Sequence, residues 1–145
     1  MTRILLVDDE APVRNLLRKL VTSDDVEIIE ADTAESALAL METTPAAVAF
    51  CDIQMPGNGG LWLAAELRRR YPATAIILAT SVTTVPASHS MRSGVIAYIL
   101  KPFSERRVVG AMRAAIQWHN ETAQSGPKVE DSIDAIGAWL KSLGD

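Results

Sequence analysis

The chain has 145 residues, of which 48% are hydrophobic and 22% charged, and its formal net charge is −4. This length fits one ordinary domain, and the composition is typical of a folded protein rather than of a disordered tail. The negative charge argues against direct binding to nucleic acid, and no apolar run reaches the roughly 18 residues that a membrane-spanning helix needs. A cytoplasmic location is therefore the default expectation, and the single Cys51 agrees with a reducing compartment.

Short apolar runs, bounded by turn-forming or charged residues, are expected to form strands. In chain order they cover 3–7, 26–31, 46–51, 75–79 and 95–100. Other segments repeat apolar residues at the spacing of one helix face, over 13–20, 34–41, 61–67 and 108–116. A shorter and weaker helix is expected over 86–93. Thr33 and Ser104 are suited to cap the helices that follow them.

Strand and helix alternate along most of the chain, and most of the strands are apolar throughout. This alternation predicts an α/β fold with a parallel sheet, because parallel strands need crossover helices that cover both faces of the sheet. Small and turn-forming residues over 123–127 interrupt the pattern, and an apolar stripe that includes Trp139 follows them. We therefore expect a domain over 1–120, a linker over 121–128 and an amphipathic helix over 129–145.

Polar side chains stand at the ends of four of the predicted strands. They are Asp8 and Asp9, Asp52, Thr80 and Ser81, and Lys101. Functional groups of an open parallel sheet meet at the carboxyl ends of its strands, so we expect these side chains to lie together. Clustered carboxylates repel one another, and a hard divalent cation such as Mg²⁺, which prefers oxygen ligands, relieves that repulsion.

The same set of side chains fits phosphoryl transfer, which depends mainly on positioning and charge neutralisation. Lys101 can offer a compact positive charge to a phosphoryl oxygen, and Thr80 can donate a hydrogen bond to one. Asp52 is the candidate nucleophile, and its product is an aspartyl phosphate.

Four segments of the sequence resemble the receiver domain of bacterial two-component response regulators. They are 6–10 (LVDDE), 51–57 (CDIQMPG), 79–81 (ATS) and 100–103 (LKPF), within a resemblance that covers residues 3 to about 120. Each segment alone is a weak match, but four in the right order, each at a predicted strand end, are a strong one. The resemblance implies a flavodoxin-like, doubly wound sheet of five parallel strands in the order 2-1-3-4-5, with an extra C-terminal helix.

The resemblance also implies a Mg²⁺ site. Asp9 is expected to bind the metal directly and Asp8 largely through water. Asp52 is expected both to bind the metal and to accept the phosphoryl group. The backbone carbonyl of Gln54 is expected to complete the ligands that the protein supplies.

Three further residues take their expected roles from the same resemblance. Thr80 and Lys101 are expected to contact the phosphoryl oxygens, and Tyr98 is expected to turn inward when Thr80 moves. The bond between Lys101 and Pro102 is expected to be cis. From Thr80 to Gly94 the spacing is about one residue shorter than is usual in the family, so the loop after the fourth strand is expected to be atypical.

The function implied is a phosphorylation-dependent signalling switch rather than an enzyme with a separate substrate, although such domains promote their own phosphorylation and dephosphorylation. A histidine kinase or phosphotransfer protein is expected to donate the phosphoryl group, and the surface formed by 86–93, 95–100 and the following helix is expected to change. The output is expected through a protein effector, onward phosphotransfer or an output domain absent from this chain, since no DNA-binding domain fits after residue 120. The terminal helix is expected to dock on this domain or on a second copy in a homodimer; the alternatives are a surface for another protein and the beginning of a longer output region.

Two other classes of protein remain open at this point. A haloacid-dehalogenase-like phosphatase also uses an aspartate nucleophile and Mg²⁺, but it usually has a second aspartate two residues after the first, where this chain has Gln54. A flavin-binding electron carrier of the same topology needs a phosphate-cradling loop after the first strand. The acids over 8–10 would repel that phosphate.

Overall fold

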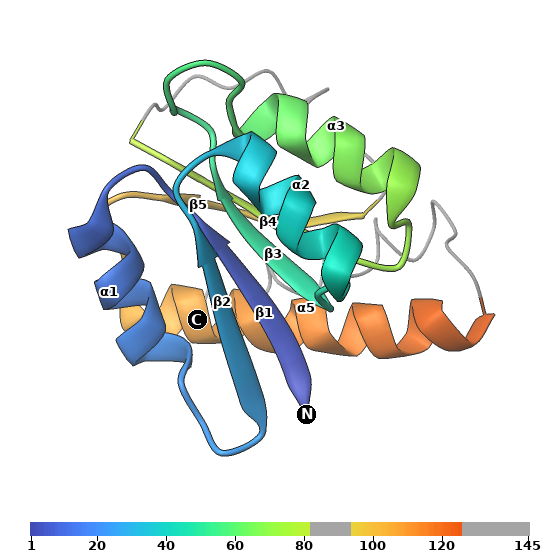
Figure 1. The fold of residues 1–145 in the computed structure, drawn as a ribbon. Coiled ribbons are helices and arrows are strands. Elements are labelled where there is room, and N and C mark those ends of the chain that lie inside the picture. Colours follow the sequence, from blue (N-terminus) through green and yellow to red (C-terminus); the bar gives the residue numbers. More distant parts are fainter. Residues whose placement is uncertain (82–93, 126–145) are drawn as a thin grey trace.

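The computed structural model describes residues 1–81 and 94–125. The strands are β1 (Thr2–Val7), β2 (Val26–Ala31), β3 (Val48–Asp52), β4 (Ala75–Thr80) and β5 (Val95–Leu100). The helices are α1 (Ala11–Val21), α2 (Ala34–Thr43), α3 (Gly60–Arg70) and α5 (Glu105–Ser125) (Figure 1). The helices expected over 86–93 and 129–145 lie outside the described residues.

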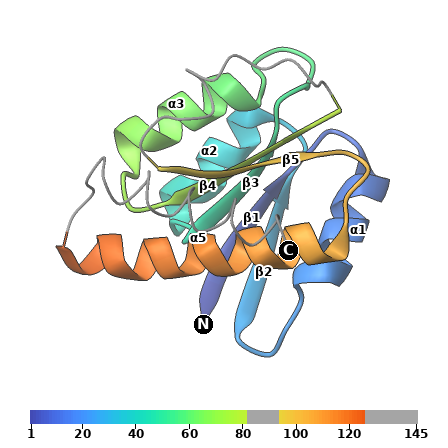
Figure 2. The same ribbon diagram turned by 180° about the vertical axis from the view of Figure 1, so that it is seen from behind.

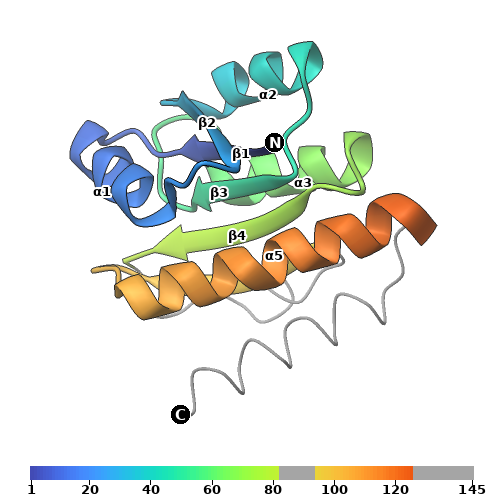
Figure 3. The same cartoon turned by 90° about the horizontal axis from the view of Figure 1, so that it is seen from below.

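The strands form one parallel sheet in the order β2-β1-β3-β4-β5, which confirms the predicted flavodoxin-like fold. Helices α1 and α5 pack on one face, where the core includes Phe50, Leu17 and Trp118. Helices α2 and α3 pack on the other face, where the core includes Leu5 and Met41. The two layers of helices are seen from behind in Figure 2 and from below in Figure 3. Apolar residues of β1, β3 and β4 are buried on both faces, as expected for central parallel strands.

Side-chain hydrogen bonds cap the beginnings of two helices, α2 and α5. The side-chain oxygen of Thr33 accepts a hydrogen bond from the Ser36 backbone N–H at 3.0 Å, and the Ser36 hydroxyl accepts one in return from the Thr33 N–H at 3.3 Å. This reciprocal capping box opens α2. The Ser104 hydroxyl accepts from the backbone N–H of Arg107 at 3.3 Å, one turn into α5. Both hydroxyls expected to cap helices therefore do so.

Helix α5 is longer than predicted. It continues to Ser125, so residues 121–125, which were expected to begin a linker, are helical. On its inner face Thr122 is buried one helical turn beyond the buried Trp118, so the packed face of the helix also extends past residue 120. Among the described residues, no helix combines the length and the hydropathy needed to cross a membrane.

Candidate functional site

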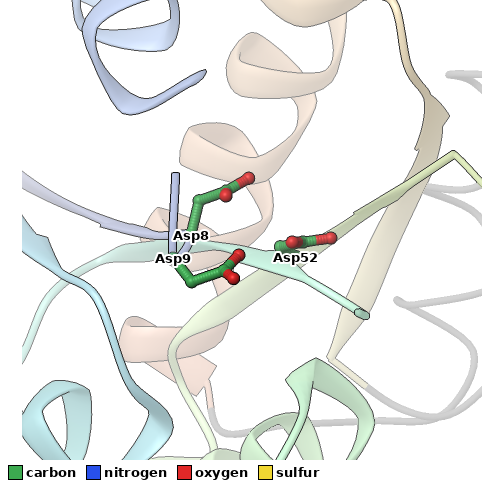
Figure 4. Close-up of side chains that lie close together, drawn as sticks. All are labelled: Asp8, Asp9 and Asp52. Carbon is green, nitrogen blue, oxygen red and sulfur yellow. The ribbon is translucent and has the colours of Figure 1, made fainter. Parts of the chain in front are cut away.

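Three carboxylates meet at the carboxyl end of the sheet (Figure 4). Asp8 directly follows β1, Asp52 is the last residue of β3, and these two strands are neighbours in the sheet. One carboxylate oxygen from each of Asp8, Asp9 and Asp52 lies within 4.8 Å of the others. Asp8 and Asp52 are only 1% and 3% exposed, whereas Asp9 is exposed. The strand ends thus bring together the acids that the sequence placed there.

Lys101 places a positive charge against two of these carboxylates. It directly follows β5, and its backbone N–H donates to the carbonyl oxygen of Thr80 at 2.8 Å. The Lys101 Nζ donates to Asp8 Oδ2 at 2.9 Å and lies 3.5 Å from Asp52 Oδ2. Burial alone would lower the pKa of Lys101, but Asp8 and Asp52 outweigh it and raise that pKa, so the amine is positively charged. The Lys101–Pro102 bond is cis, as expected.

The surroundings of Asp52, the candidate acceptor, disfavour its ionised form. Burial, and then the neighbouring Asp8 carboxylate, raise the pKa of Asp52 from 3.8 to about 6. The Lys101 charge and a 3.2 Å hydrogen bond from the Gln54 backbone N–H act in the opposite direction but are outweighed. The donor set is all oxygen, and the single charge of Lys101, which pairs with Asp8 and Asp52, does not balance three acids. These residues therefore fit a hard divalent cation such as Mg²⁺, whose charge would oppose the repulsion.

The loop between β3 and α3 is packed closely around the acceptor. The Gly60 N–H donates to the carbonyl oxygen of Ile53 at 3.2 Å, and a Cβ on Gly60 would lie 2.2 Å from the backbone oxygen of Asp52. The side-chain oxygen of Gln54 accepts a hydrogen bond from the Ser81 hydroxyl at 2.9 Å. Glycine is thus required where the chain turns past Asp52, and the loops after β3 and β4 are joined beside the acids.

The two residues expected to act as the switch lie on neighbouring strands. Thr80 is the last residue of β4 and is fully buried. Tyr98 lies on β5 opposite Leu78, packs partly against the core on the α2 and α3 face, and has its pKa raised by burial. Their places in the sheet agree with the expected roles, and those roles stay predictions.

Two residues beside the site were not singled out by any sequence motif. The Arg14 Nη1 donates to the backbone carbonyl oxygen of Asp8 at 2.6 Å, and its Nε donates to Glu30 Oε1 at 3.1 Å. Arg14 comes from α1 and Glu30 from β2, so their meeting depends on how the helix docks on the sheet. The only signal in the sequence is that Arg14 stands one helical turn after Glu10 and the acidic run.

Comparison with known proteins identifies the class to which this site belongs. Residues 4–113 match the response regulator receiver domain family, and the chain belongs to this family. Receiver domains are the phosphorylation-dependent signalling modules of two-component systems. Family membership decides against the haloacid-dehalogenase-like phosphatase and the flavin-binding carrier.

Two curated relatives are about twice as long as the segment that they share with this chain. The transcriptional regulatory protein ResD of Bacillus subtilis (strain 168) is 30% identical over 84% of this chain and 51% of its own length. The transcriptional regulatory protein SrrA of Staphylococcus aureus (strain NCTC 8325 / PS 47) is 32% identical over 90% of this chain and 55% of its own length. The chain therefore spans about half the length of the curated relatives it matches.

Solved structures show the same fold. The receiver domain of NtrX from Brucella abortus is similar with a TM-score of 0.72 and 28% identity, over 79% of this chain and 98% of that one. A response regulator receiver domain protein from Methanospirillum hungatei JF-1 has a TM-score of 0.76 at 24% identity, over 83% of this chain and 98% of that one, and shows the fold alone.

Proposed function

We propose that this chain is a Mg²⁺-dependent signalling switch in which Asp52 accepts a phosphoryl group. The observation that carries the proposal is the cluster of Asp8, Asp9 and Asp52 with the Lys101 amine bridging two of its members. Asp8, Asp9, Asp52 and the backbone carbonyl of Gln54 are the proposed ligands of the metal. When bound, Mg²⁺ would neutralise charge that develops on the phosphoryl oxygens.

The side chains of the chain have distinct parts in the transfer. An ionised oxygen of Asp52 attacks the phosphorus atom, forming a P–O bond while the bond to the donor's leaving group breaks and that group keeps the electron pair. Lys101 lies beside Asp52 and offers its charge to a phosphoryl oxygen of the product. Thr80 is proposed to donate a hydrogen bond to another such oxygen. The leaving group takes its proton from solvent or from the donor protein.

The partners follow from the family rather than from a surface of this chain. A histidine kinase or a phosphotransfer protein is the proposed donor, because two-component systems pass phosphoryl groups from such proteins to receiver domains. The named relatives are transcriptional regulators of about twice the matched length. We therefore propose that the output passes through a protein effector or a further domain, by way of the surface of β5 and α5 and of residues 86–93, which lie outside the described residues.

Beryllofluoride, which mimics a phosphoryl group, tests the site without a partner kinase. With Mg²⁺ present, fluorine NMR is expected to show a bound signal for the parent chain and none for Asp52→Asn. Asp24→Asn makes the same chemical change at an exposed position and is expected to keep the signal. An undiminished bound signal in Asp52→Asn contradicts the acceptor assignment.

Hydrogen exchange tests the switch separately from the chemistry. A receiver that responds to phosphorylation needs a region whose contacts differ between its two states. We expect beryllofluoride with Mg²⁺ to change exchange rates over residues 80–100, which include Thr80 and Tyr98. Unchanged rates in that range, with binding at Asp52 confirmed, would mean that the domain passes on phosphoryl groups without switching.

A further inference from the structure

We infer that Arg14 is a positioning residue for the Mg²⁺ site, acting through the peptide group that joins Asp8 to Asp9. This inference rests on the proposed function, since it concerns how the proposed ligands are held. Arg14 lies on α1, and its backbone N–H donates to the Glu10 carbonyl oxygen at 3.2 Å. From there its guanidinium turns back, and Nη1 donates to the Asp8 carbonyl oxygen at 2.6 Å.

The far side of the guanidinium is tied to the sheet. Nε of Arg14 donates to Glu30 Oε1 at 3.1 Å, and the other carboxylate oxygen of Glu30 accepts from Arg18 Nε and Nη2 at 2.9 and 2.6 Å. The Arg18 hydrogen bonds, together with smaller contributions from Arg14, outweigh burial and lower the pKa of Glu30, so this carboxylate stays ionised. Arg14 is 18% exposed, which limits the competition from water for its hydrogen bonds.

Asp8 is therefore held on both sides of its backbone. Its N–H donates to the Ala31 carbonyl oxygen on β2 at 3.2 Å, and its C=O is held by Arg14, which is itself fixed by Glu30 one residue earlier on the same strand. The carbonyl of Asp8 belongs to the rigid peptide plane that leads to Asp9. Fixing that plane holds the Asp9 Cα in place, so only rotation about its N–Cα bond and within the side chain can still redirect the Asp9 carboxylate.

Asp9 is the ligand that most needs this support. Asp8 and Asp52 are buried, so packing restricts their carboxylates, whereas Asp9 is exposed and packing restricts it less. Without Arg14 the Asp8 carbonyl would lose its link to Glu30 of β2, and the Asp8 N–H bond to Ala31 would remain. The Asp9 carboxylate would then sample more orientations, and binding a cation would have to order it. Residues that orient ligands in this way typically contribute about 10- to 100-fold to metal affinity.

A simple charge effect predicts the opposite sign. Arg14 is a cation near a cation site, so removing its charge reduces electrostatic repulsion and should tighten Mg²⁺ binding. If Arg14 instead positions the Asp9 carboxylate, its removal should weaken Mg²⁺ binding. Arg18 offers the matched control, because it shares the Glu30 partner and the charge, and its guanidinium donates to Glu30 rather than to Asp8.

The test is calorimetric titration of the whole chain with MgCl₂, comparing the parent with Arg14→Met and Arg18→Met after circular dichroism has shown that each is folded. We expect the Kd for Mg²⁺ to rise about tenfold or more in Arg14→Met and to stay the same or fall in Arg18→Met. If Arg14→Met does not fold, Arg14→Lys replaces it. Its single ammonium keeps the charge but cannot occupy both positions of the fork, so weaker binding is again expected.

The outcomes separate this inference from the proposed function. A parent chain that binds Mg²⁺, with an unchanged or lower Kd in the Arg14 variant, overturns the positioning role and leaves the Mg²⁺ site intact. Equal weakening in the Arg14 and Arg18 variants also overturns it, because the effect would then come from the Glu30 ion pairs. A parent chain that does not bind Mg²⁺ overturns the proposed site and this inference with it.

Discussion

Replacing Asp52 with Asn is expected to stabilise the metal-free protein near neutral pH. Asp52 is 3% exposed, and burial and then the Asp8 carboxylate raise its pKa from 3.8 to about 6. Between these two values the folded chain keeps a proton that the unfolded chain has lost, so the stability falls as pH rises through this window. Above about pH 6 the folded chain carries the full cost of a buried, ionised carboxylate. Asparagine has a similar shape and no charge, so it avoids that cost.

The size of the effect follows from the shift. About two pKa units correspond to roughly 3 kcal/mol, since one unit is about 1.4 kcal/mol. That figure is an upper value for pH 7. At pH 4 the difference should shrink to about 0.5 kcal/mol, because Asp52 of the folded parent is then protonated and, like asparagine, uncharged.

Urea unfolding in EDTA, at pH 7 and at pH 4, measures the difference directly. Asp24→Asn, at an exposed position, is the control and should change the free energy of unfolding by less than about 0.5 kcal/mol at both pH values. The reasoning is wrong if Asp52→Asn is no more stable than the parent at pH 7, or if its advantage is as large at pH 4.

Three further predictions concern the same region. Asp9→Asn should raise the Kd for Mg²⁺ and reduce the stabilisation that saturating Mg²⁺ gives, and an unchanged calorimetric titration would count against Asp9 as a ligand. Gly60→Ala should lower the free energy of unfolding by about 1–3 kcal/mol, because its Cβ would meet the Asp52 carbonyl oxygen at 2.2 Å, and equal urea midpoints would contradict this. Cys51 is fully buried, and its pKa is raised to about 12 by burial and then by the Asp52 charge. A thiol reagent should therefore modify Cys51 only after unfolding, and rapid reaction of the folded chain would refute this.

The sheet and the acid cluster could be predicted from the sequence because both follow from simple local patterns. Apolar runs marked the strands, and Asp8, Asp52 and Lys101 stood where those runs stopped. Parallel topology then requires that such residues share one edge of the sheet. The strand limits were less certain, because a residue such as Asp52 extends the strand by its backbone although its side chain interrupts the apolar run.

Two features depended on tertiary contacts that local patterns do not contain. Helix α5 passes the expected boundary, and Thr122, a residue of modest helix propensity, is buried on its inner face there. The link from Arg14 to Glu30 joins residues 16 positions apart in the chain and forms only when α1 docks beside β2. Neither Arg14 nor Glu30 belongs to a motif, so the hydrogen bonds that hold the Asp8 backbone can be identified only in the folded chain.

The most direct test of the central claim is to locate the phosphoryl group itself. The chain is incubated with acetyl phosphate and Mg²⁺, the aspartyl phosphate is reduced with borohydride to homoserine, and peptides are mapped by mass spectrometry. The expected result is modification at Asp52 in the parent, none in EDTA and none in Asp52→Asn, with Asp24→Asn behaving as the parent does. Modification at another residue of the parent, or equal modification of the Asp52→Asn chain, would contradict the assignment of Asp52 as the phosphoacceptor.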